Sequence, residues 1–210
     1  MKNRQAWMVG ALVLLGLLAL VGLLSQRPTP TRTARKTVSV KKLNLNPGSF
    51  FATQYSPYAL NGHTASLVYG KKATIVVFMA SWCKFCAYDD AYVWPKLATT
   101  SGVVVDIVDV SPYNGIGSPG PESPPWQGVD GKPHSVNRQG MIRVMQQYVH
   151  KFPLTGASIH VFVDHKGLQR WPIKSFPTSV YLDSRQKIVR VATGGLTLTQ
   201  AQPLLKAALK

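Results

Sequence analysis

Hydrophobic and polar positions alternate in short blocks from about residue 50 onward. The apolar runs of strand length are residues 74–79, 103–110, 159–164, 178–183 and 188–192. The segments with helical spacing are residues 83–97, 141–150 and 199–209. We expect Pro95 to end or kink the first of these helices. Strands that alternate with helices, followed by a terminal hairpin and a helix, predict a three-layer α/β/α sandwich.

Two further segments interrupt this alternation. Asn61-Gly62 lies between two short apolar stretches within residues 58–69, which predicts a β-hairpin. Residues 111–140 are dense in Pro and Gly, so we expect an insertion without regular structure. A connection of that length is usually functional or disordered. Our hypothesis is a flap over the functional site, with Tyr113 and Trp126 as its contact residues.

The N-terminal part of the chain has a different character. The 19 residues from 6 to 24 carry no charge, which is close to the roughly 20 residues that cross a bilayer as a helix and longer than a signal-peptide core. We interpret residues 1–26 as a signal anchor with one transmembrane helix. Residues 27–49 are basic and rich in Pro and Thr, which indicates an extended linker. Residues 50–210 then form the folded domain.

Basic residues flank the predicted span on both sides. Lys2 and Arg4 precede it, and six Lys and Arg residues follow within residues 27–42. Counting positive charges alone would keep the domain in the cytoplasm. However, a short basic N-terminus before an apolar run has the form of an export signal, and a cysteine pair used as a disulfide suits an oxidising compartment. We therefore expect a single-pass protein of the cell membrane with an extracytoplasmic domain.

A scarcity of acidic residues, more than an excess of basic ones, gives the formal net charge of +16. The first carboxylate is Asp89, and Glu122 is the single Glu. Such a composition favours anionic partners such as lipid headgroups. No nucleic-acid-binding motif occurs, so we expect no nucleic acid as partner. Few carboxylates also suit acidic surroundings, because few groups would unfold the protein on protonation. We expect Asp89 and Asp90 to lie on the surface.

The only two cysteines, Cys83 and Cys86, directly follow the apolar run at residues 74–79. A strand that delivers Cys-x-x-Cys to the start of a helix is typical of a redox site. Residues three apart share one face of a helical turn, so the two sulfurs can form and break a Cys83–Cys86 disulfide. The free N–H groups at the helix start and the charge of Lys84 favour a thiolate at Cys83. We predict Cys83 as the nucleophile and Cys86 as the resolving thiol, with no bound cofactor.

Two other uses of the pair compete with redox catalysis. A purely structural disulfide would contribute little, because in the chain-entropy picture its stabilisation grows with the length of the closed loop. Copper or zinc would need more ligands than one cysteine pair supplies, and His150, His160 or His165 could complete such a site. A metal-delivery or metal-sensing module is therefore the alternative function, although we expect no metal at the pair.

Three segments, in order, carry a resemblance to a known family. They are Leu60-Asn61-Gly62-His63-Thr64-Ala65-Ser66-Leu67 with Gly70-Lys71, then Phe78-Met79-Ala80-Ser81-Trp82-Cys83-Lys84-Phe85-Cys86, and then Ser175-Phe176-Pro177-Thr178 with a strand to Asp183 and Gly194-Gly195. Through them, residues 50–210 resemble the thioredoxin-fold family, specifically its membrane-anchored thiol–disulfide oxidoreductases of the TlpA/ResA type. The resemblance implies a thioredoxin-like three-layer α/β/α sandwich with an N-terminal hairpin.

The resemblance also implies a cis-proline loop beside the cysteines. About 5–6% of X-Pro bonds in folded proteins are cis, but the family places a cis proline where Pro177 stands. The backbone of the preceding residue, Phe176, would then pair with the substrate. The other residues expected to shape the site are Trp82, Lys84, Phe85 and Thr178. A plainer role remains open for Trp82, since an aromatic residue beside a turn can simply cover the core.

The function that the resemblance implies is disulfide exchange with extracytoplasmic proteins. The family favours reduction, for example of apocytochrome c thiols in cytochrome c maturation, with a membrane redox partner that regenerates the pair. A chaperone-like module that binds clients through the Pro-rich segment would keep the same fold.

Three positions depart from the family pattern. Val77 replaces a buried Asp that relays protons, Phe85 replaces a frequent Pro, and Pro95 lies four residues beyond the usual kink position at Ala91. Another group, or water, must then assist deprotonation of Cys86, and the direction of electron flow stays open.

Overall fold

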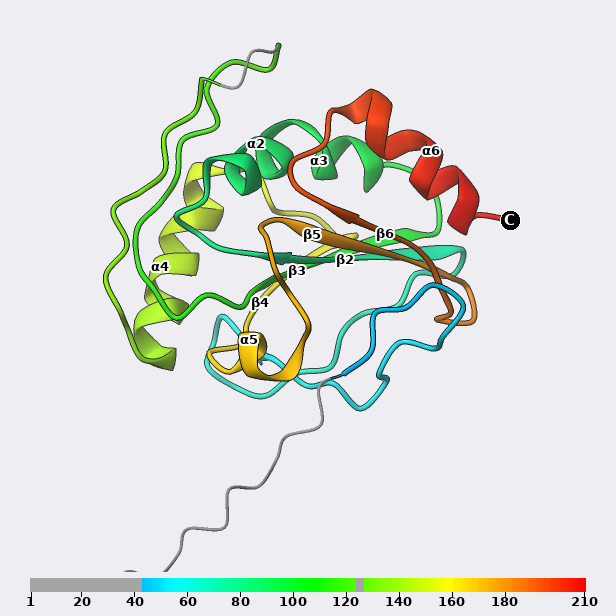
Figure 1. Cartoon of the computed structure of the whole chain (residues 1–210), viewed down its shortest axis with the longest axis horizontal. Coiled ribbons are helices and arrows are strands. Elements are labelled where there is room, and N and C mark those ends of the chain that lie inside the picture. Colours follow the sequence, from blue (N-terminus) through cyan, green and yellow to red (C-terminus); the bar gives the residue numbers. More distant parts are fainter. Residues whose placement is uncertain (1–42, 124–126) are drawn as a thin grey trace, which may run out of the picture. The chain divides into compact units, whose positions relative to one another are not determined.

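Six strands form one mixed sheet in the order β1-β4-β3-β2-β5-β6 (Figure 1). The computed structural model describes residues 43–123 and 127–210. The strands are β1 (Tyr58–Ala59), β2 (Ala73–Met79), β3 (Val103–Asp109), β4 (Ile159–Val163), β5 (Thr178–Asp183) and β6 (Ile188–Thr193). Strands β2, β3 and β4 run parallel, and β1, β5 and β6 pair antiparallel with their neighbours. The carboxyl ends of the three parallel strands therefore meet at one edge of the sheet.

Strand β2 lies inside the sheet between β3 and β5, and all seven of its residues are buried. Successive side chains of a strand point to opposite faces, so Ile75 and Val77 enter one core while Val76 and Phe78 enter the other. A strand buried on both faces reads as a continuous apolar run. This is why the predicted strand and its parallel neighbour β3 are confirmed.

The longer helices cover one face of the sheet, and mostly irregular chain covers the other (Figure 1). The helices are α2 (Lys84–Tyr92), α3 (Trp94–Leu97), α4 (Arg138–Lys151), α5 (Gly167–Arg170) and α6 (Leu198–Ala208). Helices α2, α3, α4 and α6 pack over one core, whereas residues 43–69 and the four-residue α5 cover the other. The predicted α/β/α sandwich therefore has a full helical layer on one side only.

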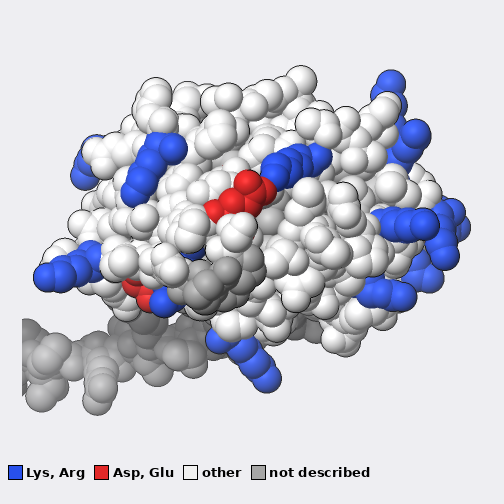
Figure 2. All heavy atoms as spheres, turned by 90° about the horizontal axis from the view of Figure 1, so that it is seen from above, with Lys and Arg blue, Asp and Glu red and all other residues white. Residues whose placement is uncertain are grey.

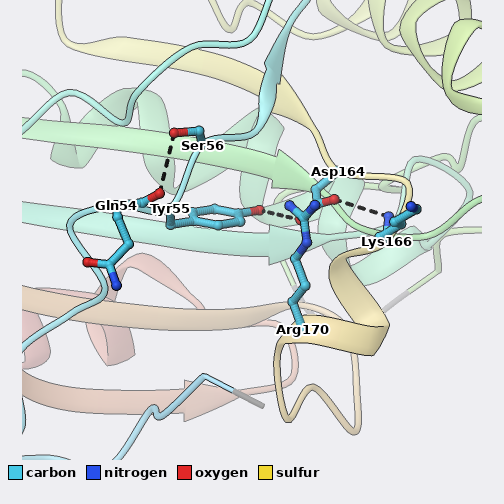
Figure 3. Close-up of polar contacts among 6 residues, drawn as sticks. All are labelled: Gln54, Tyr55, Ser56, Asp164, Lys166 and Arg170. Carbon is cyan, nitrogen blue, oxygen red and sulfur yellow. Dashed lines mark hydrogen bonds and ion pairs between the residues drawn. The ribbon is translucent and has the colours of Figure 1, made fainter. Parts of the chain in front are cut away.

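The irregular layer is held to the sheet around Asp164, which follows β4 and is fully buried (Figure 3). The Tyr55 hydroxyl donates to Asp164 Oδ2 at 3.0 Å, and Arg170 Nη1 lies 3.2 Å from the same oxygen. Trp171 packs its ring 4.9 Å from the ring centroids of both Phe51 and Tyr55. Polar and aromatic contacts together replace the missing second helical layer.

Two predicted elements differ from the structure. The turn at Asn61-Gly62 forms, but the expected second strand does not continue beyond a single bridge between Tyr58 and Thr64. Instead, the N–H of Val68 donates to Asp106 Oδ2 at 2.8 Å. The helix expected over residues 83–97 is interrupted at Val93, with proline in the first turn of α3, where its missing N–H is not needed.

The predicted membrane anchor at residues 6–24 and most of the predicted linker lie outside the described residues. Within residues 43–123 and 127–210, no helix is long and apolar enough to cross a membrane. Contacts with the folded domain begin before residue 50, because Leu43 donates its N–H to Arg170 and Gly48 donates to Ile188, both at 2.7 Å.

Candidate functional site

The cysteine pair stands at the carboxyl edge of the parallel strands. Four residues beyond Met79, the last residue of β2, Cys83 takes an extended backbone conformation (φ −79°, ψ 125°) and forms the N-cap of α2. Its Sγ accepts a hydrogen bond from the N–H of Cys86 at 3.4 Å. Both residues are free thiols, with 5% of Cys83 and 1% of Cys86 exposed. The spacing of the two cysteines thus places the second thiol directly below the first.

The two thiols differ in acidity. The pKa of Cys83 is lowered, chiefly by a hydrogen bond with the Cys86 thiol, and further by the N–H groups of Cys86 and Phe85. Burial and the charge of Asp130 oppose this lowering. Burial raises the pKa of Cys86 well above its usual value, and a charged Cys83 raises it further. Cys83 is therefore the thiol that ionises first, and it is slightly more exposed than Cys86.

A cis peptide bond joins Phe176 and Pro177 beside the pair, as the resemblance implied. Thr178, the next residue, pairs with Phe78 near the end of β2, which brings this loop opposite Cys83. The Phe176 carbonyl oxygen lies 3.9 Å from Cys83 Sγ. The Thr178 hydroxyl donates to the Ser175 carbonyl at 2.8 Å and closes the loop.

Aromatic side chains flank the thiol. The rings of Trp82 and Phe176 meet edge to face, with centroids 6.0 Å apart. The indole Nε1 of Trp82 donates to Ser111 Oγ at 3.0 Å, so the ring is fixed at its polar end. Lys84 Nζ lies 5.3 Å from the centroid of the Phe85 ring. Trp82 therefore contacts the site as well as the core.

Residues 111–140, named the arm from here on, pack against the main chain that leads into Cys83. The arm's N–H groups at Gly117 and Gly131 donate to the carbonyls of Ser81 (2.9 Å) and Trp82 (2.7 Å). A Cβ at Gly117 would lie only 2.8 Å from the Cys83 carbonyl oxygen. The described part of the arm contains isolated bridges but no strand, and it packs beside the cysteine pair.

Tyr113 and Trp126 were the contact residues expected for the arm. Tyr113 is 41% exposed, and Trp126 lies outside the described residues. The observed contacts come instead from backbone groups and from Asp130, whose Oδ1 accepts the N–H of Lys84 at 2.8 Å. Glycines permit such close approach of two main chains. The number of glycines in the arm was the only sequence signal for these backbone contacts.

The expectation that Asp89 and Asp90 lie on the surface is wrong, because both are fully buried. Asp89 Oδ1 accepts the N–H of Leu196 at 2.9 Å, and Asp90 Oδ2 accepts the hydroxyl of Tyr148 at 2.6 Å. Helix α2 thus directs them toward the chain before α6 and toward α4. Their spacing of three and four residues from Cys86 places them on the face of that cysteine.

Burial shifts the acidity of these carboxyl groups. It raises the pKa of Asp90 to about 7, against the lowering effect of the Tyr148 hydroxyl. Burial also raises the pKa of Asp89 well above its usual value. The charge of Asp90 contributes to the raised pKa of Cys86. A carboxyl group that titrates near neutrality therefore interacts with the resolving thiol, although Val77 occupies the family's usual position.

The three histidines weighed as metal ligands do not join the cysteines. Within residues 43–123 and 127–210, no group of three or more His, Cys, Asp or Glu side chains is placed to hold a metal ion. His160 lies on β4, His165 follows that strand, and His150 is in the last turn of α4.

The mixed sheet, the Cys-x-x-Cys pair at the start of α2 and the cis proline opposite it together define a thioredoxin-like fold. Neither protein-family models nor curated proteins match this sequence. Solved structures do match it across most of the domain.

Three of these structures show the likeness. One is described as the thiol:disulfide interchange protein DsbE from Chlorobium tepidum (TM-score 0.54, 18% identity, 80% of this chain and 100% of that chain). Another is a secreted Mycobacterium tuberculosis disulfide oxidoreductase homologous to E. coli DsbE (TM-score 0.51, 14% identity, 74% of this chain and 96% of that chain). The third is the thioredoxin domain of a thiol-disulfide oxidoreductase from Bacteroides vulgatus (TM-score 0.50, 16% identity, 76% of this chain and 97% of that chain). At such identities the likeness establishes the fold.

Proposed function

We propose that this protein is a membrane-tethered thiol–disulfide oxidoreductase that exchanges disulfides with extracytoplasmic proteins through Cys83 and Cys86. The observation that carries the proposal is the contrast between the two thiols. Cys83, with the lowered pKa, stands beside the Phe176 carbonyl, and Cys86 is buried beneath it. The named activities of the structural relatives are in line with this chemistry.

In the reducing direction, the Cys83 thiolate attacks one sulfur of a substrate disulfide. A mixed disulfide with Cys83 forms, the substrate S–S bond breaks, and the first substrate thiolate leaves. Cys86 then loses its proton and attacks Cys83 Sγ, which releases the second substrate thiolate. Two electrons have passed to the substrate, and the protein is left with a Cys83–Cys86 disulfide.

We assign Asp90 as the group that accepts the Cys86 proton in the second step. It lies one turn after Cys86 on α2, and its pKa of about 7 matches a base that works near neutrality. The Tyr148 hydroxyl at 2.6 Å orients the carboxylate. Asp90 thereby serves as the proton acceptor for Cys86, a role that the apolar side chain of Val77 cannot perform.

The remaining parts of the proposal follow from the sequence. Residues 6–24 would anchor the protein in the cell membrane, with the domain on the extracytoplasmic side. A membrane redox partner would return electrons to the Cys83–Cys86 disulfide, as in the TlpA/ResA type. Reduction is the favoured direction, and no bound cofactor is needed. A membrane-impermeant thiol reagent applied to intact cells should label Cys83, and labelling only after lysis would place the domain inside.

Trapping of the mixed disulfide tests the proposed chemistry. The Cys86→Ser variant should accumulate a one-to-one adduct at Cys83 when mixed with a small peptide disulfide, because the resolving step is lost. The Cys83→Ser variant should form none. Adduct formation by Cys83→Ser, or none by Cys86→Ser, would contradict the assignment of the two thiols.

A further inference from the structure

The arm places a carboxylate at the same helix end as the reactive thiol. Lys84 is the first residue of α2, and its N–H donates to Asp130 Oδ1 at 2.8 Å. Cys83 is the N-cap of that helix. The unpaired N–H groups at a helix start stabilise anions. The Asp130 carboxylate and the Cys83 thiolate therefore share one positive helix end.

The main chain around Asp130 is fixed, so its position does not depend on a flexible side chain alone. The next residue, Gly131, donates its N–H to the Trp82 carbonyl at 2.7 Å, and Val129 exchanges backbone hydrogen bonds with Ser118 at 2.8 and 3.0 Å. The Gly131 bond holds the arm to the residue that precedes Cys83, and the Val129 bonds join two segments of the arm to each other. The carboxylate is thus part of the site, although it comes from the insertion.

Few carboxylates lie on the face that Figure 2 shows. Residues 43–210 contain sixteen Lys and Arg and eight acidic residues, and five of the eight are buried. The three that remain are Glu122, Asp130 and Asp183. Glu122 pairs with Lys96 and Asp183 pairs with Arg185. On a largely cationic surface, an acidic residue at the active-site helix is therefore an exception.

We infer that Asp130 is a positioning residue that weakens thiolate formation at Cys83 and so makes the pair a stronger reductant. This inference rests on the proposed exchange reaction. The thiolate exists only in the reduced protein, so a neighbouring negative charge destabilises the reduced form relative to the disulfide. A destabilised reduced form gives up its two electrons to a substrate disulfide more readily.

Other charged and titratable groups face the same thiol. Asp89 and Asp90 lie on α2, Tyr148 on α4 and Cys86 below, and each interacts electrostatically with Cys83. These groups are buried and belong to the helical core. Asp130 differs because it is exposed, and its charge opposes the lowering of the Cys83 pKa. It can be neutralised without disturbing the core.

The test compares the Asp130→Asn variant with the parent protein, using the reduced full-length chain. The amide oxygen can still accept the Lys84 N–H, but the charge is gone. Iodoacetamide alkylation is followed against pH, and mass spectrometry quantifies the Cys83 peptide. We expect the pKa of Cys83 to fall by about half a unit, which is about threefold more thiolate below the pKa. The reduction potential should become less negative.

A matched control and a salt series separate charge from structure. Glu122→Gln removes the other carboxylate of the arm and should leave the Cys83 pKa unchanged. The difference between Asp130→Asn and the parent should shrink at about 1 M salt, because salt screens exposed charges. An unchanged Cys83 pKa in Asp130→Asn, or a fall that salt does not reduce, would overturn the inference. If the parent forms no reversible disulfide, the proposed function fails, while the thiol comparison still decides the role of Asp130.

Discussion

Asp164 and Asp90 are both fully buried, yet their surroundings differ. Asp164 Oδ2 accepts the Tyr55 hydroxyl and pairs with Arg170, and Oδ1 accepts a backbone N–H at 3.0 Å. Asp90 accepts only the Tyr148 hydroxyl, and its Oδ1 has no hydrogen-bond partner among the described residues. A buried carboxylate costs free energy unless it is paired. Asp164 therefore has partners that compensate for its burial, whereas Asp90 carries a cost that its proposed role as the base for Cys86 would explain.

The contrast extends to other buried carboxylates. One oxygen each of Asp89 and Asp109 also has no partner in the described chain, and both residues lie at the cysteine end of the molecule. Asp106 Oδ1 also has no partner in the described chain, but Asp106 Oδ2 accepts the N–H of Val68, in the segment that precedes β2. A missing partner alone therefore does not mark a functional carboxylate. Asp90 is distinguished by its electrostatic interaction with the Cys86 thiol, which raises the pKa of that thiol.

The largest effect should come from removing the nucleophile Cys83, because the step that Asp90 assists follows its attack. Cys83→Ser should abolish disulfide exchange with a peptide disulfide, while chemical unfolding gives the same free energy of unfolding for the reduced protein. Asp164→Ala should instead lower the free energy of unfolding and leave disulfide exchange by the folded protein in place. Exchange activity that survives in Cys83→Ser would remove the basis for the comparison.

Asp164→Ala should lower the free energy of unfolding by about 2–4 kcal/mol, because Arg170 and the Tyr55 hydroxyl both lose a buried, charged acceptor. Urea titration followed by far-UV circular dichroism measures this change. The pKa of Cys83 in the folded fraction should not change. A loss below about 0.5 kcal/mol would show that Asp164 is not the structural carboxylate of the pair.

Asp90→Asn should slow the attack of Cys86 on the mixed disulfide by about tenfold to a hundredfold near pH 7, because the proton acceptor is lost. The same variant should be as stable as the parent, or more stable, above pH 8, since it removes a buried charge. Stopped-flow release of a fluorescent substrate thiol measures the rate. An unchanged rate would exclude Asp90 as the base.

Tyr148→Phe offers a graded variant of the same pair. The hydroxyl lowers the pKa of Asp90, so its loss should move the pH profile of the resolving step to higher pH without abolishing the step. A purely structural role of Tyr148 would reduce stability and leave the profile in place.

The last prediction concerns stability against pH. Burial raises the pKa of Asp90 to about 7 and that of Asp106 to about 8, whereas in the unfolded chain both titrate near 3.9. The folded state therefore binds more protons between these values, and its stability should rise as pH falls from about 8 to about 4. Urea midpoints at intervals across this range test it, and the rise should be smaller in Asp90→Asn. Unfolding near pH 4 would contradict this expectation.

Much of the fold could be predicted because local patterns decide it. The central strands are continuous apolar runs, and the Cys-x-x-Cys pair follows one of them. The cis bond before Pro177 and the place of Phe176 beside Cys83 followed from the family resemblance. These features depend on residues close in the sequence or on a motif with fixed spacing.

The rest depends on contacts between distant segments. Asp89 and Asp90 read as surface residues, since a carboxylate pair on a short helix is usually solvated, but α4 and the chain before α6 cover them. Asp106 takes the N–H of Val68 that a second hairpin strand would have used. The docking of Asp130 on Lys84 brings together residues 46 positions apart. No local pattern could reveal these contacts.

The reduction potential of the Cys83–Cys86 pair decides whether the pair exchanges disulfides and in which direction. The full-length protein would be equilibrated with glutathione buffers while its thiol content and tryptophan fluorescence are followed. We predict one reversible two-electron transition near or below about −230 mV, in the range of thioredoxin and the glutaredoxins. A potential near about −120 mV would keep the exchange chemistry and reverse its direction. Failure to form a reversible disulfide at any glutathione ratio would contradict the account.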